Sequence, residues 1–213
     1  MIKTKLKSRL VVSIAGRTHH MMEDSFGNKS DYFKNIMLKY CDNVKIIQSY
    51  KGERYIPNPG DILIITGSNE SVTKIKPWMK DLKESIVQSL EYRIPILGIC
   101  FGHQILADSF GAKVINNQKG REIGSCKIHL SEDGLNSTIF KGFDKTFFAY
   151  ETHEDIVVDD KEVLVELASN SYGLQAFKVN DIHYGVQFHP EFTMELMKIF
   201  IDINQMDKPI NKD

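Results

Sequence analysis

The segment PILGICFGHQ, residues 95–104, decides how this chain folds. Its apolar residues predict a buried strand over residues 94–99, and a helix over residues 104–110 is predicted to follow at once. Cys100 lies between the two, with one glycine two positions before it and another two positions after it. A residue at so sharp a strand-to-helix turn has a strained backbone, and the glycines remove side chains that would otherwise collide there.

The same spacing predicts chemistry at Cys100. The pattern G-x-nucleophile-x-G presents a serine above the sheet of α/β-hydrolases. Here the nucleophile would be a thiol at a helix N-terminus, where the helix dipole favours the thiolate. The alternative is a buried cysteine on an ordinary strand, and these five residues alone favour that alternative. A second motif downstream reverses the preference.

That second motif is HYGVQFHPE, residues 183–191. A histidine activates a cysteine by taking its proton, and a carboxylate orients the histidine. His189 and Glu191 are two positions apart, so their side chains point the same way in an extended segment. Pro190 disfavours a helical conformation at His189 and keeps the segment extended. Alone, the tripeptide favours a solvated strand end, but beside the Cys100 turn it indicates a Cys-His-Glu triad.

The rest of the chain alternates strands and helices in its first half and is rich in strands in its second half. We therefore expect an α/β fold in which antiparallel strands of the second half return His189 to Cys100. The apolar run at residues 61–66 is typical of a parallel strand that is buried on both faces. Further helices are predicted over residues 30–40, 77–92 and 192–206. Further strands are predicted over residues 10–15, 44–48, 112–115, 123–130, 147–150, 163–168, 173–179 and 182–188.

Composition limits the class of protein. A chain of 213 residues fits one domain, predicted here as residues 1–206 with a polar tail at residues 207–213. The net charge of −1 provides no field that would attract nucleic acid or an anionic membrane. No apolar run approaches the roughly 20 residues that span a bilayer. Three cysteines without paired spacing argue against disulfides, and with a thiol nucleophile they predict a cytoplasmic protein.

Two other cysteines and a histidine-containing stretch carry weaker signals. Cys126 alternates with apolar residues and is predicted to be a core cysteine, and Cys41 is also predicted to pack in the interior. The polar stretch at residues 19–24 contains His19 and His20, whose role the sequence leaves open. We interpret it as a solvated loop rather than a metal site, because the residues show no ligand spacing on a regular element.

Four segments resemble motifs of the class I glutamine amidotransferases, the family with a Cys-His-Glu triad, and they follow one another along the chain in the order found in that family. They are GICFGHQ at residues 98–104, GVQFHPE at 185–191, IITGS at 64–68 and GLQAF at 173–177. Within the family the chain is similar to stand-alone domains like the amidotransferase part of GMP synthase. The resemblance covers residues 60–203 well and the first 60 residues loosely.

The resemblance implies a single α/β domain of the flavodoxin-like type, with a mostly parallel central sheet, flanking helices and additional antiparallel strands. It also implies an oxyanion hole formed by the backbone N–H groups of Gly67 and Phe101. Many relatives have two glycines where this chain has Thr66 and Gly67, so the departure falls on one of the expected donors. Without the Cys100 turn, Gly67 would be interpreted as a plain turn glycine.

Contacts to the substrate follow from the same resemblance. Gln104 matches a position that holds glutamine, and the alternative is an amide on a helix surface. His153 matches a position at the rim of the site, although a structural histidine is the preferred interpretation. Arg121 lies in a segment that matches a loop near the glutamine pocket, although a solvated arginine is the preferred interpretation. The resemblance implies no metal and no organic cofactor.

The leading hypothesis is therefore a glutaminase that releases ammonia from glutamine through a cysteinyl thioester. No P-loop pattern is present, so the ammonia would serve a separate synthetase. A stand-alone γ-glutamyl hydrolase or peptidase with the same chemistry is the alternative. A non-catalytic regulatory or binding module is a third, and the intact Cys100, His189 and Glu191 argue against it. The true substrate, the ammonia acceptor and the oligomeric state stay open.

Overall fold

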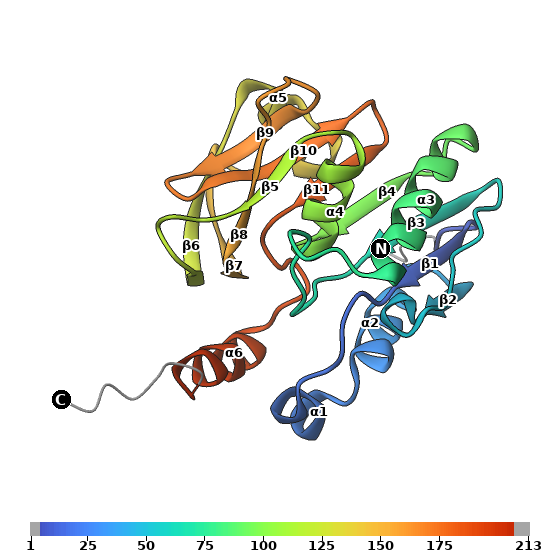
Figure 1. The fold of residues 1–213 in the computed structure, drawn as a ribbon, viewed down its shortest axis with the longest axis horizontal. Helices are drawn as coiled ribbons and strands as arrows, with labels where there is room; N and C mark the ends of the chain where they lie inside the picture. Colours follow the sequence, from blue (N-terminus) through green and yellow to red (C-terminus); the bar gives the residue numbers. More distant parts are fainter. Residues whose placement is uncertain (1–4, 207–213) are drawn as a thin grey trace.

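A computed structural model describes residues 5–206 of the chain. Its main feature is a nine-stranded sheet with the order β2-β1-β3-β4-β11-β10-β9-β6-β7, and β5 pairs with β8 in a separate two-stranded sheet. Figure 1 shows helices on both sides of the large sheet. The strands are β1 (Arg9–Ser13), β2 (Val44–Ile47), β3 (Asp61–Ile65), β4 (Ile96–Ile99), β5 (Lys113–Asn116), β6 (Glu122–Leu130), β7 (Thr146–His153), β8 (Asp155–Val158), β9 (Val165–Asn170), β10 (Gly173–Val179) and β11 (His183–Val186). The helices are α1 (His20–Phe26), α2 (Lys29–Met37), α3 (Pro77–Glu91), α4 (Phe101–Ser109), α5 (Glu132–Asn136) and α6 (Met194–Met206).

The half of the sheet that contains β2, β1, β3, β4 and β11 is parallel throughout. This order is the flavodoxin-like one, in which ligands bind beyond the carboxyl ends of the strands. The remaining pairs, from β11 to β7, are antiparallel. The predicted α/β class, with additional antiparallel strands in the second half, is therefore confirmed.

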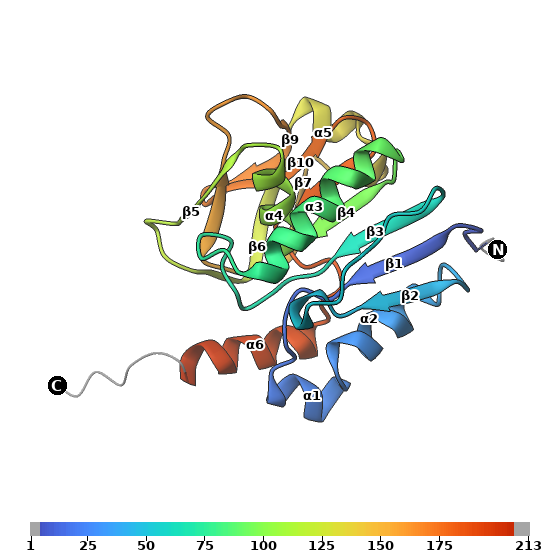
Figure 2. The same ribbon diagram turned by 45° about the vertical axis from the view of Figure 1, so that its right-hand side comes forward.

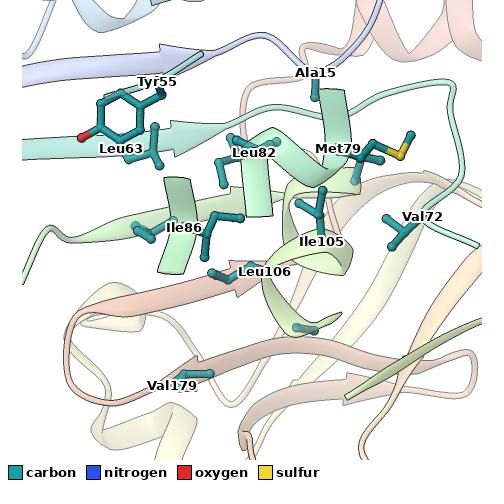
Figure 3. Packing of buried hydrophobic residues seen from close by; sticks show 14 of the residues in the cluster. Ala15, Tyr55, Leu63, Val72, Met79, Leu82, Ile86, Ile105, Leu106 and Val179 are labelled. Carbon is teal, nitrogen blue, oxygen red and sulfur yellow. The ribbon is translucent and has the colours of Figure 1, made fainter. Parts of the chain in front are cut away.

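Both faces of the parallel half are buried, which explains its continuous apolar strands. Successive residues of a strand point to opposite faces, so Leu63 packs on one side and Ile64 on the other. On the side of Leu63, the helices α3 and α4 contribute Leu82 and Ile105 among others (Figure 3). On the side of Ile64, Phe33 of α2 is part of the core. Two layers of helices therefore hold the strand ends in place.

The hairpin of β6 and β7 carries the chain back toward Cys100. β6 pairs with β7 from Glu122 to His129, but it pairs with β9 only at His129 and Leu130. The part of the hairpin away from its connecting loop, which contains Glu122 and His153, thus extends past β9. There the backbone N–H of His189 donates to the carbonyl of Tyr150 at 2.8 Å. This contact joins the segment after β11 to the antiparallel second half of the sheet.

Several predicted boundaries are wrong for identifiable reasons. Residues 20–26 form α1 rather than a loop, because the side chain of His19 accepts from the N–H of Met21 and Met22 is buried against the protein. The helix predicted over residues 30–40 is α2, which begins at residue 29 with Asn28 as its cap and ends at residue 37. Neither β8 nor the short α5 was predicted. The predicted tail at residues 207–213 lies outside the described residues.

Within residues 5–206, no helix is both long enough and apolar enough to cross a bilayer.

Candidate active site

Cys100 occupies the turn between β4 and α4, with a backbone φ of 52° and ψ of −102°. Positive φ is uncommon for a residue with a side chain and indicates local strain. A Cβ atom on Gly98 would collide with the carbonyl of Gly102, and a Cβ atom on Gly102 would collide with the carbonyl of Ile65. The N–H of Cys100 donates to the carbonyl of Val186 at 2.9 Å, which fixes the turn to β11. Both flanking glycines are therefore needed for the geometry that the sequence indicated.

His189 and Glu191 form a buried pair next to this turn. Nδ1 of His189 lies 2.8 Å from Oε1 of Glu191, and both side chains are almost fully buried. The ring of Phe192 stacks on the imidazole with centroids 4.1 Å apart. The hydroxyl of Tyr32 donates to the carbonyl of Glu191 at 2.6 Å. The imidazole is thus held by its carboxylate on one edge and by an aromatic ring on one face.

The other edge of the imidazole is left for the thiol. Nε2 of His189 is buried and has no hydrogen-bond partner among residues 5–206. Burial lowers the pKa of His189, but the charges of Glu191 and Cys100 outweigh burial and raise it to about 10. The raised pKa favours a protonated imidazole in the position between Glu191 and Cys100. The pair therefore suits proton exchange with Cys100.

Two residues from different parts of the chain, Gly67 and Phe101, lie next to Cys100. Gly67 follows β3, and a Cβ atom there would lie 2.9 Å from Cε1 of His189 and 3.6 Å from Cβ of Cys100. Phe101 is the first residue of α4, so no carbonyl of that helix accepts its N–H. Its ring is buried and packs on Trp78 with centroids 5.5 Å apart. The fold thus brings Gly67 and Phe101, which are distant in the sequence, to one place beside Cys100.

A cavity of about 330 Å³ opens at Cys100, and Gly67, His189 and Glu191 are among its walls. Gln104 also borders it and is buried, with its Nε2 donating to the carbonyl of Asp155 at 2.9 Å and to Oε1 of Gln187 at 3.1 Å. The alternative of an amide on the helix surface is therefore wrong for Gln104.

His153 borders the cavity as well, but both of its ring nitrogens are occupied. Nδ1 lies 3.0 Å from the carbonyl of Asp155, and Nε2 lies 3.0 Å from Oε2 of Glu122. Arg121 reaches the cavity from the start of the hairpin, is mostly exposed and pairs with Glu154 at 3.3 Å. The preferred interpretations of both residues, a structural histidine and a solvated arginine, agree with these contacts.

Glu122, Glu151 and His153 form a buried cluster in which the possible ligand atoms all lie within 4.8 Å of one another. The sequence did not predict this cluster. Amide groups of Asn170 and Gln175 donate to the two oxygens of Glu122, at 2.6 and 3.0 Å. Because both ring nitrogens of His153 face oxygen acceptors, neither offers a lone pair to a cation, and the cluster fits a hydrogen-bonded network better than a metal site. His19 and His20 are not part of it.

The two glutamic acids of this cluster have pKa values shifted in opposite directions. Burial alone would raise the pKa of Glu122, but the hydrogen bonds and charge of His153 bring it below its usual value. Burial, and then the charge of Glu122, raises the pKa of Glu151 well above its usual value. Neither oxygen of Glu151 has a hydrogen-bond partner among residues 5–206. Glu151 therefore holds its proton more tightly than an ordinary glutamic acid, and its neighbour Glu122 holds its proton less tightly.

The other cysteines do not approach His189 in this way. Cys41 is fully buried, as predicted. Cys126 is only half-buried rather than part of the core, because its side chain faces Glu122 at the open end of the hairpin. Burial is the main cause that raises the pKa of the Cys126 thiol to about 12, with Glu122 adding to it. Cys126 is thus a poor nucleophile compared with a thiol beside a protonated imidazole.

Comparison with known proteins gives consistent findings. The sequence model of the family described as glutamine amidotransferase class-I matches residues 31–206. A glutamine amidotransferase-like protein of Schizosaccharomyces pombe is 32% identical over 200 residues, which are 91% of this chain and 78% of that protein. A glutamine-hydrolysing GMP synthase subunit of Methanococcus vannielii is 39% identical over 105 residues, which are 48% of this chain and 53% of that protein.

Among solved structures, a glutamine amidotransferase of Thermotoga maritima superimposes with a TM-score of 0.73 at 23% identity, over 94% of this chain and 84% of that chain. This likeness supports the fold. The matched length varies among the relatives: the alignment with the glutamine-hydrolysing GMP synthase of Petrotoga mobilis spans only 30% of that protein.

Proposed function

The chain belongs to the class-I glutamine amidotransferase family, and from this premise we propose that it hydrolyses the side-chain carboxamide of glutamine through a thioester on Cys100. One observation carries the proposal. A cysteine at a strained strand-to-helix turn borders the same cavity as a buried imidazole whose far edge is held by a carboxylate. That combination supplies a nucleophile, a base and an orienting group within one site.

In the first step, the thiolate of Cys100 attacks the carbonyl carbon (Cδ) of the glutamine side chain. The carbonyl oxygen becomes an oxyanion, for which the N–H groups of Gly67 and Phe101 are the proposed donors. Donors of this kind contribute about 3–4 kcal/mol each in other acyl-transfer enzymes. Thr66 beside Gly67 does not alter this, because the donor is a main-chain group.

In the second step, the C–N bond breaks and His189 gives its proton to the departing nitrogen. Ammonia leaves and a γ-glutamyl thioester remains on Cys100. Water then attacks the thioester while His189 takes a proton from it, and glutamate is released. Glu191 holds the imidazole in one tautomer and stabilises its charged form throughout. We place Gln104 and His153 beside the glutamyl part of the substrate, since both border the cavity.

The fate of the ammonia follows from its chemistry. Uncharged ammonia is the nucleophile that an amination needs, so we propose a separate synthetase as the acceptor. Relatives named as glutamine-hydrolysing GMP synthase subunits support a partner of that kind. Because a free thiolate needs reducing conditions, we also propose that the protein works in the cytoplasm.

A specific observation favours a second candidate, a γ-glutamyl hydrolase that needs no partner. The cavity does not end at Cys100 but continues between α1, α2 and α6, where Met22 and Phe200 are among its walls. Ammonia would not need this space. The same thioester chemistry would serve a substrate with a larger leaving group.

The proposed function is tested by glutamate release from glutamine and from γ-glutamyl dipeptides. We expect Cys100→Ala to abolish release, because no other group can form the thioester. Cys126→Ala is the matched control and keeps the wild-type rate. Release that continues in Cys100→Ala, with the protein folded, would refute the assignment of Cys100.

A further inference from the structure

The cavity has two parts that differ in chemistry, and Cys100 lies between them. One part is polar and is bordered by Gln104, His153 and Asp155 from α4 and the hairpin. The other part lies between α1, α2 and α6, two of which, α1 and α6, are in contact (Figure 2). Its walls are largely apolar and come from Met22, Phe33, Phe192, Phe200 and Ile203. We call this second part the apolar compartment.

The side chain of Lys29 borders the apolar compartment. Lys29 is the first residue of α2, and its backbone N–H donates to the hydroxyl of Thr18 at 2.8 Å. Its Nζ donates to the carbonyl of Gly67 at 3.3 Å, which places the ammonium next to the proposed oxyanion hole. Within residues 5–206 it forms no ion pair with a carboxylate. An ammonium has three donors, so two remain for a ligand in the cavity.

The surroundings of Lys29 disfavour its charged form. Burial lowers the pKa of Lys29, and the charges of Glu191 and Cys100 only partly oppose this. Lys29 is half-buried, and a cation that is partly removed from water is stabilised when an anion pairs with it. A carboxylate that enters with the substrate would provide that partner.

The chemistry of the leaving group identifies such a carboxylate. Ammonia, the leaving group of glutamine, has neither charge nor apolar surface. An amino acid joined through its nitrogen to the γ-carbonyl carries its carboxylate only two bonds from the scissile nitrogen. That carboxylate would therefore lie close to Cys100 and Gly67, where Lys29 is. The side chain of the amino acid would extend from there into the apolar compartment.

We propose that the site cleaves γ-glutamyl peptides whose leaving amino acid has a free α-carboxylate, bound by Lys29, and an apolar side chain, bound in the apolar compartment. The inference rests on the thioester chemistry proposed for Cys100. The carbonyl carbon of the γ-glutamyl group forms a bond with the sulfur, its C–N bond breaks, and His189 protonates the departing amine. Water then cleaves the thioester, so one peptide and one water give glutamate and the free amino acid.

The decisive comparison uses γ-glutamyl-leucine and γ-glutamyl-3-methylbutylamide, which differ only in the carboxylate of the leaving group. We expect the wild-type kcat/KM for the peptide to exceed that for the amide at least tenfold. In Lys29→Met we expect the ratio to fall to near one. Taking the ratio within each variant cancels any effect of Lys29 on the thiolate itself. Lys34→Met, which alters an exposed lysine of the same helix, is the matched control and keeps the wild-type ratio.

A second comparison tests the apolar compartment. We expect wild-type protein to prefer γ-glutamyl-leucine to γ-glutamyl-glycine, and Ile203→Gln to reduce that preference severalfold. Calorimetric titration of Cys100→Ala with the peptide and the amide measures binding without turnover. There the dissociation constant for the peptide should be at least tenfold lower.

The outcomes separate the two proposals. Equal kcat/KM for peptide and amide, or equal dissociation constants in Cys100→Ala, would overturn this inference. If glutamate release still depended on Cys100, the proposed function would stand. Failure to release glutamate from these compounds alone would overturn this inference, and failure with glutamine as well would overturn both.

Discussion

Two histidines that border the same cavity are each paired with a carboxylate, and they differ in what faces the second ring nitrogen. Nδ1 of His189 faces Glu191 at 2.8 Å, while its Nε2 has no hydrogen-bond partner among residues 5–206. In the other pair, Nε2 of His153 faces Glu122 at 3.0 Å, and Nδ1 faces the carbonyl of Asp155 at 3.0 Å. A ring with one nitrogen free beside a thiol can accept and return a proton. A ring held at both nitrogens must first break a buried hydrogen bond.

The difference shows that pairing with a carboxylate does not by itself make a histidine a catalytic base. Both imidazoles are buried and both carboxylates are within hydrogen-bond distance. The third neighbour decides the role, and it is a thiol for His189 and a main-chain carbonyl for His153. We therefore propose proton transfer for the first pair and support of the hairpin for the second.

Replacing His189 tests the first half of this comparison and should have the largest effect. We expect His189→Asn to lower kcat for glutamate release by about 10²–10⁴-fold, the contribution of a positioned acid–base group. The measurement is initial-rate kinetics on protein whose fold is verified by circular dichroism. A variant that kept more than a tenth of the wild-type kcat would remove His189 from the proposed mechanism.

Replacing His153 tests the second half and should act on stability. His153→Asn leaves the carboxylate of Glu122 buried without its hydrogen bond to His153, a change that typically costs about 1–3 kcal/mol. We expect the denaturation midpoint to fall accordingly, with kcat reduced less than tenfold in protein that is still folded. A large loss of kcat at unchanged stability would reverse the assignment and make His153 part of the reacting centre.

A third substitution sharpens the account of the second pair through its pH dependence. The pKa of Glu151 is raised in the folded protein, first by burial, so the folded state holds this proton more tightly than the unfolded state. The stability that this provides is present at low pH and is lost as pH rises above the ordinary value near 4.5. Glu151→Gln removes the titration and keeps the shape.

We expect Glu151→Gln to match wild-type stability near pH 4 and to be the more stable protein at pH 7 and above. Thermal unfolding across this pH range is the measurement. Parallel curves for the two proteins would show that Glu151 ionises normally in the folded state. This is the smallest of the three effects, because both proteins keep every other contact of the cluster.

The two pairs also differ in how far the sequence predicts them. His189 and Glu191 are two residues apart, so the extended segment around Pro190 is enough to bring them together. Glu122 and His153 are 31 residues apart and meet because the register of β6 and β7 places them opposite each other. A sequence without an alignment does not reveal that register. The first pair was therefore predicted and the second was not.

The fold shows the same division between local and distant causes. The strands at residues 61–66 and 94–99 were predicted because buried parallel strands are apolar along their whole length. α1 was missed because its only buried residue is Met22, which leaves no helical apolar pattern. Lys29 was missed because its proximity to Gly67 depends on how α2 packs beside the end of β3.

The central claim is that the sulfur of Cys100 attacks the side-chain carbonyl carbon of the substrate. A glutamine analogue with a chloromethyl ketone in place of the carboxamide tests it most directly, with the modified residue identified by peptide mass spectrometry. The account predicts one adduct, on Cys100, whose formation is slowed by glutamine or by γ-glutamyl-leucine, with Cys41 and Cys126 unmodified. Labelling of Cys126 instead, or glutamate release that persists in protein fully alkylated at Cys100, would contradict it.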